Sequence, residues 1–280
     1  MKRRLFMRFP NGLNKALTLS YDDGVEQDIR FMEILNKNGI KCTFNINSGC
    51  YAPEGKVYEE GTIHRPMTKR ACVELYKNSG HEVAVHGYTH PWLEKLPPAQ
   101  VAYEIIKDRE DLEKTYGCIV RGMAYPYGTY NDDVVRVLAD CGIVYARTTK
   151  TTEKFDIPTD WLRMPATCHH NNPALMDLAR CFAEAKYTQP KLFYLWGHSY
   201  EFEGKDNWSV IEEFCQYMGG RDDIWYATNI EIYEYIEDYK RLVFSSDMSI
   251  IKNPTARKLW FGLGGKEYSI DPGQTIVVEE

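Results

Sequence analysis

The sequence has no excess of positively charged residues. Among its 280 residues, 34 Lys and Arg stand against 40 Asp and Glu, for a formal net charge of -6. Proteins that bind nucleic acid through its phosphates usually carry a basic patch or stripe. The charge balance therefore argues against nucleic acid as a partner.

The N-terminal segment is short of apolar residues. Its basic start, MKRRLFMRFPNGLNK, has only a few apolar residues before Pro10. The h-region of a signal peptide needs about 7–15 apolar residues, and a membrane span needs about 20. We therefore expect no membrane partner and a cytoplasmic location. Secretion remains the alternative if a leader has been removed ahead of residue 1.

Several signatures of catalysis and metal binding are absent. The eight Cys are scattered and form no CxxC pair, so we interpret them as small buried hydrophobic residues. No GxSxG, Walker loop or GxGxxG occurs. The sequence therefore lacks the motifs typical of serine hydrolases, P-loop proteins and Rossmann folds. The piece GLGGK at 262–266 lacks the Ser or Thr and the helix of a phosphate loop, and it indicates a hairpin.

The composition present is that of an ordinary globular protein, with 44% apolar and 26% charged residues. Helices are expected at 28–37, from the cap Thr68 to Tyr76, and from 97–98 to Gly117. Strands that alternate with helices predict a parallel sheet. Seven short β-type runs occur between helical stretches, at 15–20, 40–46, 82–86, 119–124, 143–147, 191–196 and 224–228.

Polar residues follow four of these runs, which favours a barrel over a doubly wound sheet. YDDG follows the first run, HGYTH the third, YPYG the fourth and GHS the sixth. In a (β/α) barrel the carboxyl ends of all strands meet at one mouth, so distant clusters can share a site. We predict an α/β fold, an incomplete or distorted (β/α) barrel of about seven parallel strands, over residues 1–240.

The pattern changes after about Tyr239. Helical periodicity stops, and short apolar runs are separated by Asn-Pro, Gly-Gly and Pro-Gly pairs. This predicts a small β-rich C-terminal extension, residues 241–280, packed on the barrel. Its edge strands could pair with a second copy of the chain, so a homo-oligomer through the extension is a further hypothesis.

Two carboxylates and two histidines have a spacing that suits a metal. Asp22 and Asp23 are adjacent, so on an extended chain they point to opposite sides and can serve different tasks. His86 and His90 lie four residues apart and can reach one ion, with a carboxylate as third ligand. Taken alone, DDG is a common turn and loop histidines can face solvent. Together they favour a mononuclear metal hydrolase.

Two further segments bring polar groups to the predicted mouth. Pro126 and Tyr127 lie in the turn YPYG, whose backbone N–H groups could line an oxyanion pocket, unless it is simply a Pro-Gly turn. His198 follows the apolar run LFYLWG, where a histidine suits proton transfer near neutral pH. A core histidine bonded to a backbone carbonyl is the simpler alternative.

Four motifs in chain order resemble the polysaccharide deacetylase family, the carbohydrate esterase family 4 type, whose shared fold is the NodB homology domain. SYDDG (20–24) is similar to its TFDDG, HGYTH (86–90) to H-S/T-x-x-H, AYPYG (124–128) to R-x-P-Y/F-G, and LWGH (195–198) to L-x-x-H. FDIPTDW (155–161) loosely resembles an Asp-Trp motif. These segments lie within residues 15–230.

The resemblance implies roles for these residues. Asp23, His86 and His90 would hold a divalent metal, usually Zn²⁺, with Co²⁺, Ni²⁺ or Mn²⁺ as other possibilities. Asp22 would be the general base, the backbone N–H of Tyr127 would support the oxyanion, and His198 would protonate the leaving amine. Asp160 would orient His198, and the substrate pocket would be walled by Pro126, Trp161 and Trp196.

Two positions depart from the family pattern. Ala124 stands where the third motif has an arginine, so Asp22 loses a partner and its pKa should rise unless another cation, such as Arg121 or Arg163, substitutes. Gly87 replaces the Ser or Thr of the second motif, which should loosen the histidine turn. Neither change removes an expected metal ligand.

The function implied is hydrolytic removal of acetyl groups from N-acetylated, or less readily O-acetylated, carbohydrate. The 20 Tyr and 6 Trp could face sugar rings. One alternative is a cytoplasmic hydrolase of a small non-peptide amide or ureide. A second is a catalytically silent carbohydrate-binding domain, against which the complete set of expected metal ligands and His198 argues.

Overall fold

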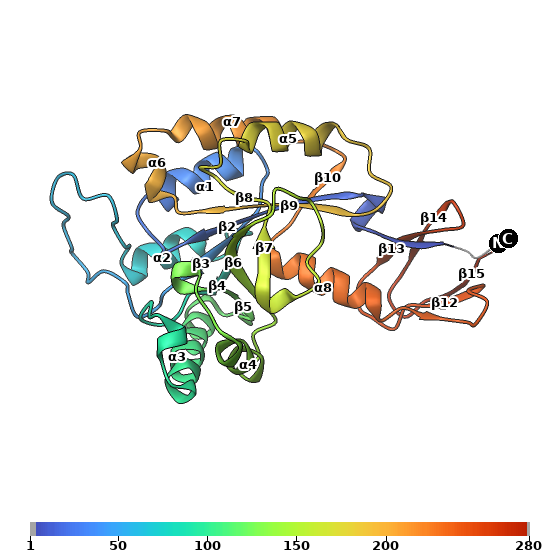
Figure 1. Ribbon diagram of the computed structural model, residues 1–280, viewed down its shortest axis with the longest axis horizontal. Helices are drawn as coiled ribbons and strands as arrows, with labels where there is room; N and C mark the ends of the chain where they lie inside the picture. Colours follow the sequence, from blue (N-terminus) through green and yellow to red (C-terminus); the bar gives the residue numbers. More distant parts are fainter. Residues whose placement is uncertain (1–3, 279–280) are drawn as a thin grey trace.

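A parallel β-sheet curled into a barrel forms the centre of the protein, as the computed structural model of residues 4–278 shows (Figure 1). Its strands lie in the order β7-β6-β5-β4-β3-β2-β9-β8, and β10 pairs with β2. All seven predicted strands occur, and the distorted barrel is confirmed. The strands predicted from the sequence are β2 (Lys15–Asp22), β3 (Cys42–Ile46), β4 (Glu82–Val85), β5 (Gly122–Ala124), β6 (Tyr145–Thr151), β9 (Lys191–Gly197) and β10 (Ile224–Tyr226).

The segment that joins the two edges of the sheet was not predicted. β7 (Met164–Ala166) pairs with β6, and β8 (Cys168–His169) pairs with β9. Between them the backbone N–H of Thr167 donates to the carbonyl of Tyr194, 2.9 Å away. One short stretch of chain therefore lies against both edges and completes the ring, whereas β10 lies beside the first half of β2.

Helices cover the outside of the sheet (Figure 1). The predicted cap of α2 forms, because Thr68 Oγ1 accepts from the N–H of Ala71 at 3.2 Å, and Gly117 ends α3 with φ 71°. The helices are α1 (Asp28–Lys37), α2 (Lys69–Tyr76), α3 (Pro98–Tyr116), α4 (Asp132–Asp140), α5 (Leu175–Glu184), α6 (Tyr200–Gly204), α7 (Trp208–Met218) and α8 (Asn229–Lys240). Short 3-10 turns are η1 (Pro10–Gly12), η2 (Leu93–Lys95), η3 (Pro126–Gly128) and η4 (Trp161–Arg163).

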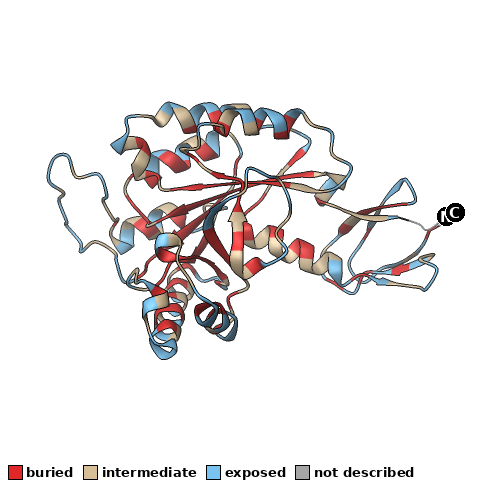
Figure 2. Ribbon diagram, viewed as in Figure 1, coloured by how far each residue is buried: buried red, intermediate tan, exposed pale blue. Residues whose placement is uncertain are grey.

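Buried residues fill the barrel (Figure 2), and most of them are apolar, with polar side chains among them. Every residue of β2 is buried. Five of the eight cysteines are buried as expected, but Cys50, Cys118 and Cys181 are exposed. Within residues 4–278 no helix is both long and apolar enough to cross a membrane. Two of the buried polar residues, Asp22 and Arg147, are important for the site described below, because both are charged and almost fully buried.

Residues near both ends of the chain build the extension. β1 (Leu5–Arg8) pairs antiparallel with β13 (Leu259–Leu263), which pairs with β14 (Lys266–Ile270). A second sheet contains β11 (Val243–Phe244), β12 (Ile250–Lys252) and β15 (Thr275–Val277). The hydroxyl of Tyr235 in α8 donates to the carbonyl of Arg8 at 2.7 Å and ties β1 to the barrel. β-structure after residue 240 was expected and β1 was not; the division at residue 240 stays a prediction.

A buried carboxyl at the start of α1 should make stability depend on pH. Asp28 is fully buried. Its Oδ1 accepts from Ser199 Oγ at 2.5 Å, and its Oδ2 accepts from the hydroxyl of Tyr76 at 2.6 Å. Burial outweighs these bonds and raises the pKa of Asp28 from 3.8 to about 7. The folded protein therefore holds this proton over a pH range in which the unfolded chain has released it.

We expect this group to lower the free energy of unfolding as pH rises from about 4 to about 7, by roughly 4 kcal/mol in all, with no further change above that range. The Asp28→Asn side chain cannot ionise. The free energy of unfolding of this variant should therefore fall less over the same pH range, by about the same 4 kcal/mol. Urea unfolding of metal-free protein between pH 4.5 and 8 measures the difference. The exposed carboxylate variant Asp177→Asn should follow the wild-type profile, and identical slopes for wild type and Asp28→Asn would contradict the prediction.

Candidate active site

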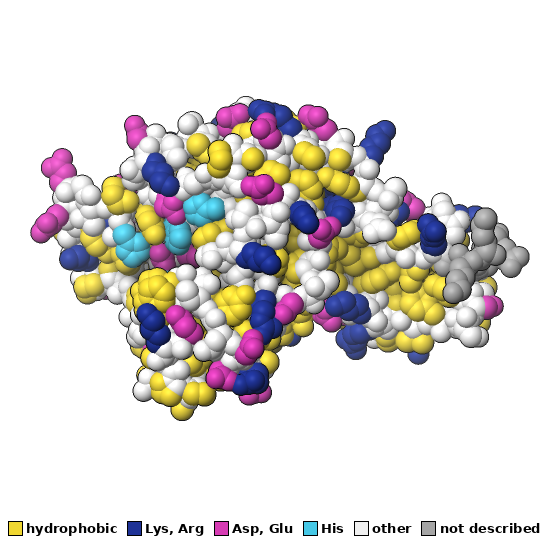
Figure 3. Space-filling view, viewed as in Figure 1, with side chains coloured by type: hydrophobic (Ala, Val, Ile, Leu, Met, Phe, Trp, Pro, Cys, Tyr) yellow, Lys and Arg dark blue, Asp and Glu magenta, His cyan; other side chains and the backbone are white. Residues whose placement is uncertain are grey.

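The predicted polar clusters meet in one pocket at the carboxyl ends of the strands. Figure 3 shows histidine and acidic side chains gathered on this part of the surface. The cavity has a volume of about 310 Å³. It is lined by Asp22, Asp23, His86, His90, Tyr125, Tyr127, Gly128, Arg147, Thr149, Trp196, His198 and Tyr200.

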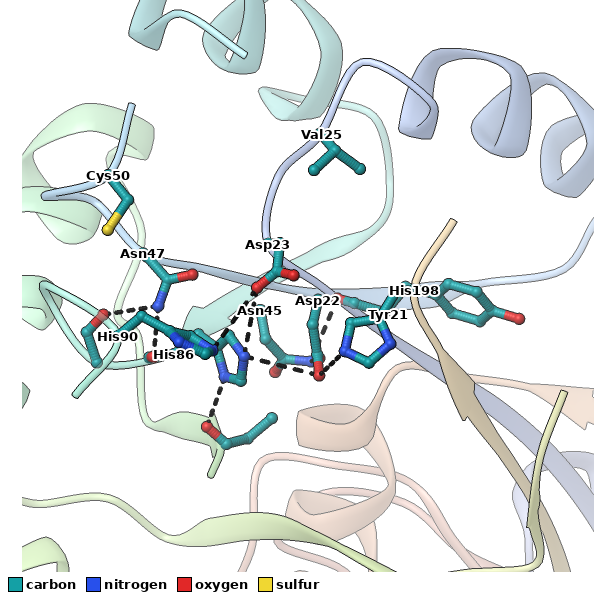
Figure 4. Close-up of polar contacts among 12 residues, drawn as sticks. Tyr21, Asp22, Asp23, Val25, Asn45, Asn47, Cys50, His86, His90 and His198 are labelled. Atoms are coloured by element: carbon teal, nitrogen blue, oxygen red, sulfur yellow. Dashed lines mark hydrogen bonds and ion pairs between the residues drawn. The ribbon is translucent and has the colours of Figure 1, made fainter. Parts of the chain in front are cut away.

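Asp23, His86 and His90 direct one atom each toward a common point (Figure 4). The Oδ1 atom of Asp23 lies 3.6 Å from Nε2 of His86 and 3.9 Å from Nε2 of His90. Ligand atoms that share one tetrahedral zinc ion are about 3.3 Å apart, given bonds near 2 Å. The three side chains therefore have the donor types and nearly the spacing of a metal site.

The ring orientation of His86 is set by a hydrogen bond on its far side. Nδ1 of His86 donates to the carbonyl of Ala124 at 2.8 Å, which leaves Nε2 facing the pocket. The carboxylate of Asp108 accepts from the backbone N–H groups of His86 and Ser48, at 3.0 and 2.8 Å. Burial, together with the neighbouring His86, lowers the pKa of His90 to about 4. His90 is therefore a neutral ring at physiological pH, as a metal ligand must be.

The backbone at the pocket is held in a costly conformation. Asp23, His90 and Tyr127 have φ values of 82°, 56° and 57°, in the left-handed region that side chains other than glycine seldom adopt. Such residues cost about 1–3 kcal/mol each and cluster at functional sites. Gly87 also has a positive φ, 76°, and a Cβ there would lie 3.2 Å from Pro126 Cγ. Glycine at this departure from the family pattern thus lets the turn pack closely against the next one.

Asp22 pairs with an arginine that sequence reasoning missed. Arg147 in β6 forms a buried ion pair with Oδ2 of Asp22, and its guanidinium lies 4.4 Å from the ring centroid of Trp196. Asn45 Nδ2 donates to Oδ1 of Asp22 at 2.8 Å. Burial alone would raise the pKa of Asp22, but Arg147, with His86 and His198, lowers it below its ordinary value.

Another cation does substitute, as the sequence analysis allowed, but it is Arg147 and neither of the two arginines named there. Arg121 pairs with Glu234 at 2.7 Å, and Arg163 pairs with two carboxylates outside the pocket. Arg147 is the register partner of Ala124 across the β5–β6 pair. The positive charge that the family pattern puts on β5 is thus supplied from the adjacent strand, at the same level of the sheet.

His198 is oriented by Glu201. Its Nε2 lies 3.7 Å from Oδ2 of Asp22, and its Nδ1 lies 2.8 Å from Oε1 of Glu201. Burial by itself favours the neutral ring, but the bond to Glu201 and the charge of Asp22 raise the pKa of His198. Asp160, expected in this role, instead caps η4 by accepting from the N–H of Leu162 at 3.1 Å. That expectation was wrong, because Asp160 begins a separate turn.

Glu201 also accepts from a second histidine. Nε2 of His169 lies 3.2 Å from its Oε1. The ligand atoms of His169, His198 and Glu201 lie close enough for an ion. However, Nδ1 of His169 accepts from the N–H of Asn171 at 3.1 Å, so the neutral ring carries its proton on Nε2. The arrangement suits a carboxylate that receives N–H donors better than a metal.

The remaining predicted residues separate into two groups. Tyr127 and Trp196 line the cavity. Pro126 is buried beside Gly87 and is not one of the cavity-lining residues in the part of the chain that the structure describes, so its expected role as a pocket wall was wrong. Trp161 is not among the described residues that line the cavity, because its ring packs edge-on against Tyr233 of α8, with centroids 5.2 Å apart. The expected role of Trp161 as a pocket wall was therefore wrong.

The barrel, with these motifs in order at its mouth, defines a protein of the NodB homology type. Residues 10–146 match the family model described as polysaccharide deacetylase. This match covers just under half of the chain, which resembles the polysaccharide deacetylase family over that part.

Curated relatives are similar over part of their length. The chitooligosaccharide deacetylase of Bradyrhizobium sp. (strain ANU 289) is 32% identical over 154 residues, which cover 53% of this chain and 60% of that protein. The peptidoglycan-N-acetylglucosamine deacetylase PgdA of Listeria monocytogenes is 27% identical over 124 residues, 43% of this chain and 23% of that protein. The aligned region thus spans less than two thirds of either relative.

Solved structures share the fold. A putative polysaccharide deacetylase from Mycobacterium smegmatis superposes with a TM-score of 0.60 at 17% identity, covering 83% of this chain and 93% of that one. The Puue allantoinase superposes with a TM-score of 0.59 at 14% identity, covering 81% and 91%. The same barrel therefore occurs in proteins that are named for different reactions.

Proposed function

We propose that this protein is a metal-dependent deacetylase of N-acetylated carbohydrate. The observation that carries the proposal is the convergence of Asp23 Oδ1 with Nε2 of His86 and His90, beside the ionised Asp22. One carboxylate and two imidazoles suit Zn²⁺, and Co²⁺, Ni²⁺ or Mn²⁺ could occupy the same donors. Relatives named as chitooligosaccharide and peptidoglycan-N-acetylglucosamine deacetylases support the substrate class.

A bound divalent ion would polarise the acetyl carbonyl and make a water more acidic. Asp22 is the base that takes the proton of the attacking water at Oδ2, the oxygen nearest to His198. The charge of Arg147 keeps this carboxylate ionised. The backbone N–H of Tyr127, in the turn that lines the cavity, is the donor proposed for the oxyanion.

His198 is the proposed general acid. Its bond from Nδ1 to Glu201 fixes the ring and leaves Nε2 as the atom that donates to the departing amine. Because the neighbouring carboxylates raise the pKa of His198, the proton-carrying form extends toward neutral pH. Asp22 and His198 therefore have environments that favour opposite protonation states, as an acid and base pair requires.

Replacing Asp23, His86 or His90 with Ala should strip the metal, since each change removes one of three converging ligand atoms. Metal content after dialysis, determined by mass spectrometry, should fall by at least about tenfold. His81→Gln is the matched control, because His81 instead accepts from the backbone N–H of Cys42 outside the pocket. Full occupancy in all three alanine variants would show that the ligands are other residues.

Acetate release from a panel of N- and O-acetylated mono- and oligosaccharides, with Zn²⁺ or Co²⁺ supplied, tests the activity directly. Wild type should release acetate, and Asp23→Ala should not. No release from a sample shown to carry metal would reject carbohydrate deacetylation. Binding of an oligosaccharide without turnover would then indicate a silent carbohydrate-binding domain.

A second candidate is hydrolysis of a small non-peptide amide or ureide. The cavity of about 310 Å³ is near the lower end of the usual range for ligand pockets, and the fold superposes equally well on an allantoinase. Adding ureides to the panel separates the two candidates, because only one class should be turned over at a substantial rate.

A further inference from the structure

The long connection between β3 and α2 projects from the barrel (Figure 1) and brings a third histidine to Asp23. Nε2 of His64 lies 3.4 Å from Oδ2 of Asp23. The His64 side chain is about half exposed (50%), whereas that of Asp23 is 13% exposed. Its ring stands edge-on to that of Tyr200, with centroids 5.0 Å apart. His64 therefore lies at the rim of the pocket, between Asp23 and Tyr200.

The two oxygens of Asp23 have different partners. Oδ1 faces His86 and His90, at 3.6 and 3.9 Å, and Oδ2 faces His64. Among the described residues, the group whose ligand atoms converge contains Asp23, His86 and His90 but not His64. A donor on Oδ2 fixes the rotation of the carboxylate and presents Oδ1 to the two histidines.

The residue after His64 is anchored strongly. Nε of Arg65 donates to Glu26 at 2.7 Å, and its two terminal nitrogens donate to Glu203 at 2.7 and 2.9 Å. A guanidinium that meets a carboxylate through two parallel bonds fixes geometry as well as charge. Glu26 follows the Asp23 turn and Glu203 lies in α6, so Arg65 ties this end of the connection to both sides of the pocket.

Backbone bonds continue this attachment. The N–H of Glu26 donates to the carbonyl of Arg65 at 2.8 Å, and the N–H of Met67 donates to that of Gly24 at 2.9 Å. Nε2 of Gln27 donates to the carbonyl of Ile63 at 2.7 Å. Residues 63–67 are therefore held along the turn that carries Asp23, although His64 itself belongs to a surface connection.

We propose that His64 is a positioning residue for Asp23, which bonds Oδ2 and holds Oδ1 toward the metal, and that Arg65 is its anchor. The inference rests on the proposed metal-dependent function. It adds a contact outside the ligand set, supplied by a segment in which the sequence shows no motif.

Co²⁺ binding to the metal-free protein tests the role, followed by the visible absorption of the ion and by competition with a chelator. His64→Ala should weaken Co²⁺ binding about 10–100-fold, the usual cost of losing such a partner. His64→Gln keeps an N–H donor near the Nε2 position and should recover most of the affinity. Arg65→Met should weaken binding too, and adding it to His64→Ala should cost less than the two single effects combined.

Val57→Ala is the matched control, because Val57 lies on the same connection and is 84% exposed. This variant should bind Co²⁺ as wild type does. Unchanged affinity in His64→Ala, with wild type binding normally, would overturn the inference and leave the proposed function standing. Loss of binding as complete as in Asp23→Ala would also overturn it, because His64 would then be a ligand. Failure of wild type to bind Co²⁺ would instead reject the proposed function. Circular dichroism spectra should stay the same in every variant.

Discussion

Asp22→Asn should lower kcat for acetate release by about 10²–10⁴-fold and leave the metal content unchanged. That range is what a positioned general base contributes. Asparagine keeps the shape of the side chain and the contact with Asn45, but it cannot take a proton from water. Steady-state kinetics on metal-loaded enzyme, with metal determined on the same samples, measures both quantities.

Two results would contradict this role for Asp22. Activity within about threefold of wild type would mean that another group is the base, and parallel loss of metal and activity would mean that Asp22 is a ligand. Asp132→Asn is a suitable control, because its carboxylate is exposed and paired with Arg163 outside the cavity. That variant should keep the wild-type kcat.

Arg147→Met should destabilise the fold by about 3–5 kcal/mol, because it leaves the buried carboxylate of Asp22 without its cation. Methionine retains most of the volume against Trp196, so the loss reports mainly on charge. Urea unfolding at neutral pH measures it. Arg121→Met, which removes a partly exposed ion pair with Glu234, should cost less than about 1 kcal/mol.

The same variant should change the pH profile of activity. Without Arg147, burial dominates and the pKa of Asp22 rises, so the base form is lost at a higher pH than in wild type. The acid limb of the kcat/KM profile should therefore move to higher pH. A stability loss no larger than that of Arg121→Met, with an unchanged acid limb, would show that Arg147 does not support the base.

The parts of the site that could be predicted are those encoded in short stretches. Asp22, Asp23, His86 and His198 lie at or just after the ends of predicted strands, and His90 lies four residues after His86, so a strand pattern and the barrel rule place them at one mouth. No packing detail was needed for that step. The same reasoning gave all seven of the strands that it proposed.

Arg147 and Glu201 depended on tertiary detail. Arg147 acts because β6 lies beside β5 in a register that sets it opposite Ala124, and one sequence does not show that register. A signal was present, since Arg147 ends the apolar run 143–147, and a charged residue in a buried strand needs a partner. Glu201 was also within reach, as its position three residues after His198 puts both on one helical turn.

Three other features carried little local signal. β7 and β8 are short, and Pro165 interrupts the apolar pattern. β1 is four residues long, and it is a strand because it pairs with β13, which lies far away in the sequence. His64 lies in a connection without periodicity, where only the folded backbone brings it to Asp23.

The pairing of β1 with β13 also bears on how the chain is made. Leu5 pairs with Leu263, so 258 positions of the chain separate these two partners. The barrel strands in between can associate during translation, whereas β1 keeps an open edge until β13 has also emerged. This outer sheet therefore assembles after the barrel strands, and a nascent chain halted before residue 259 carries β1 without its partner strand.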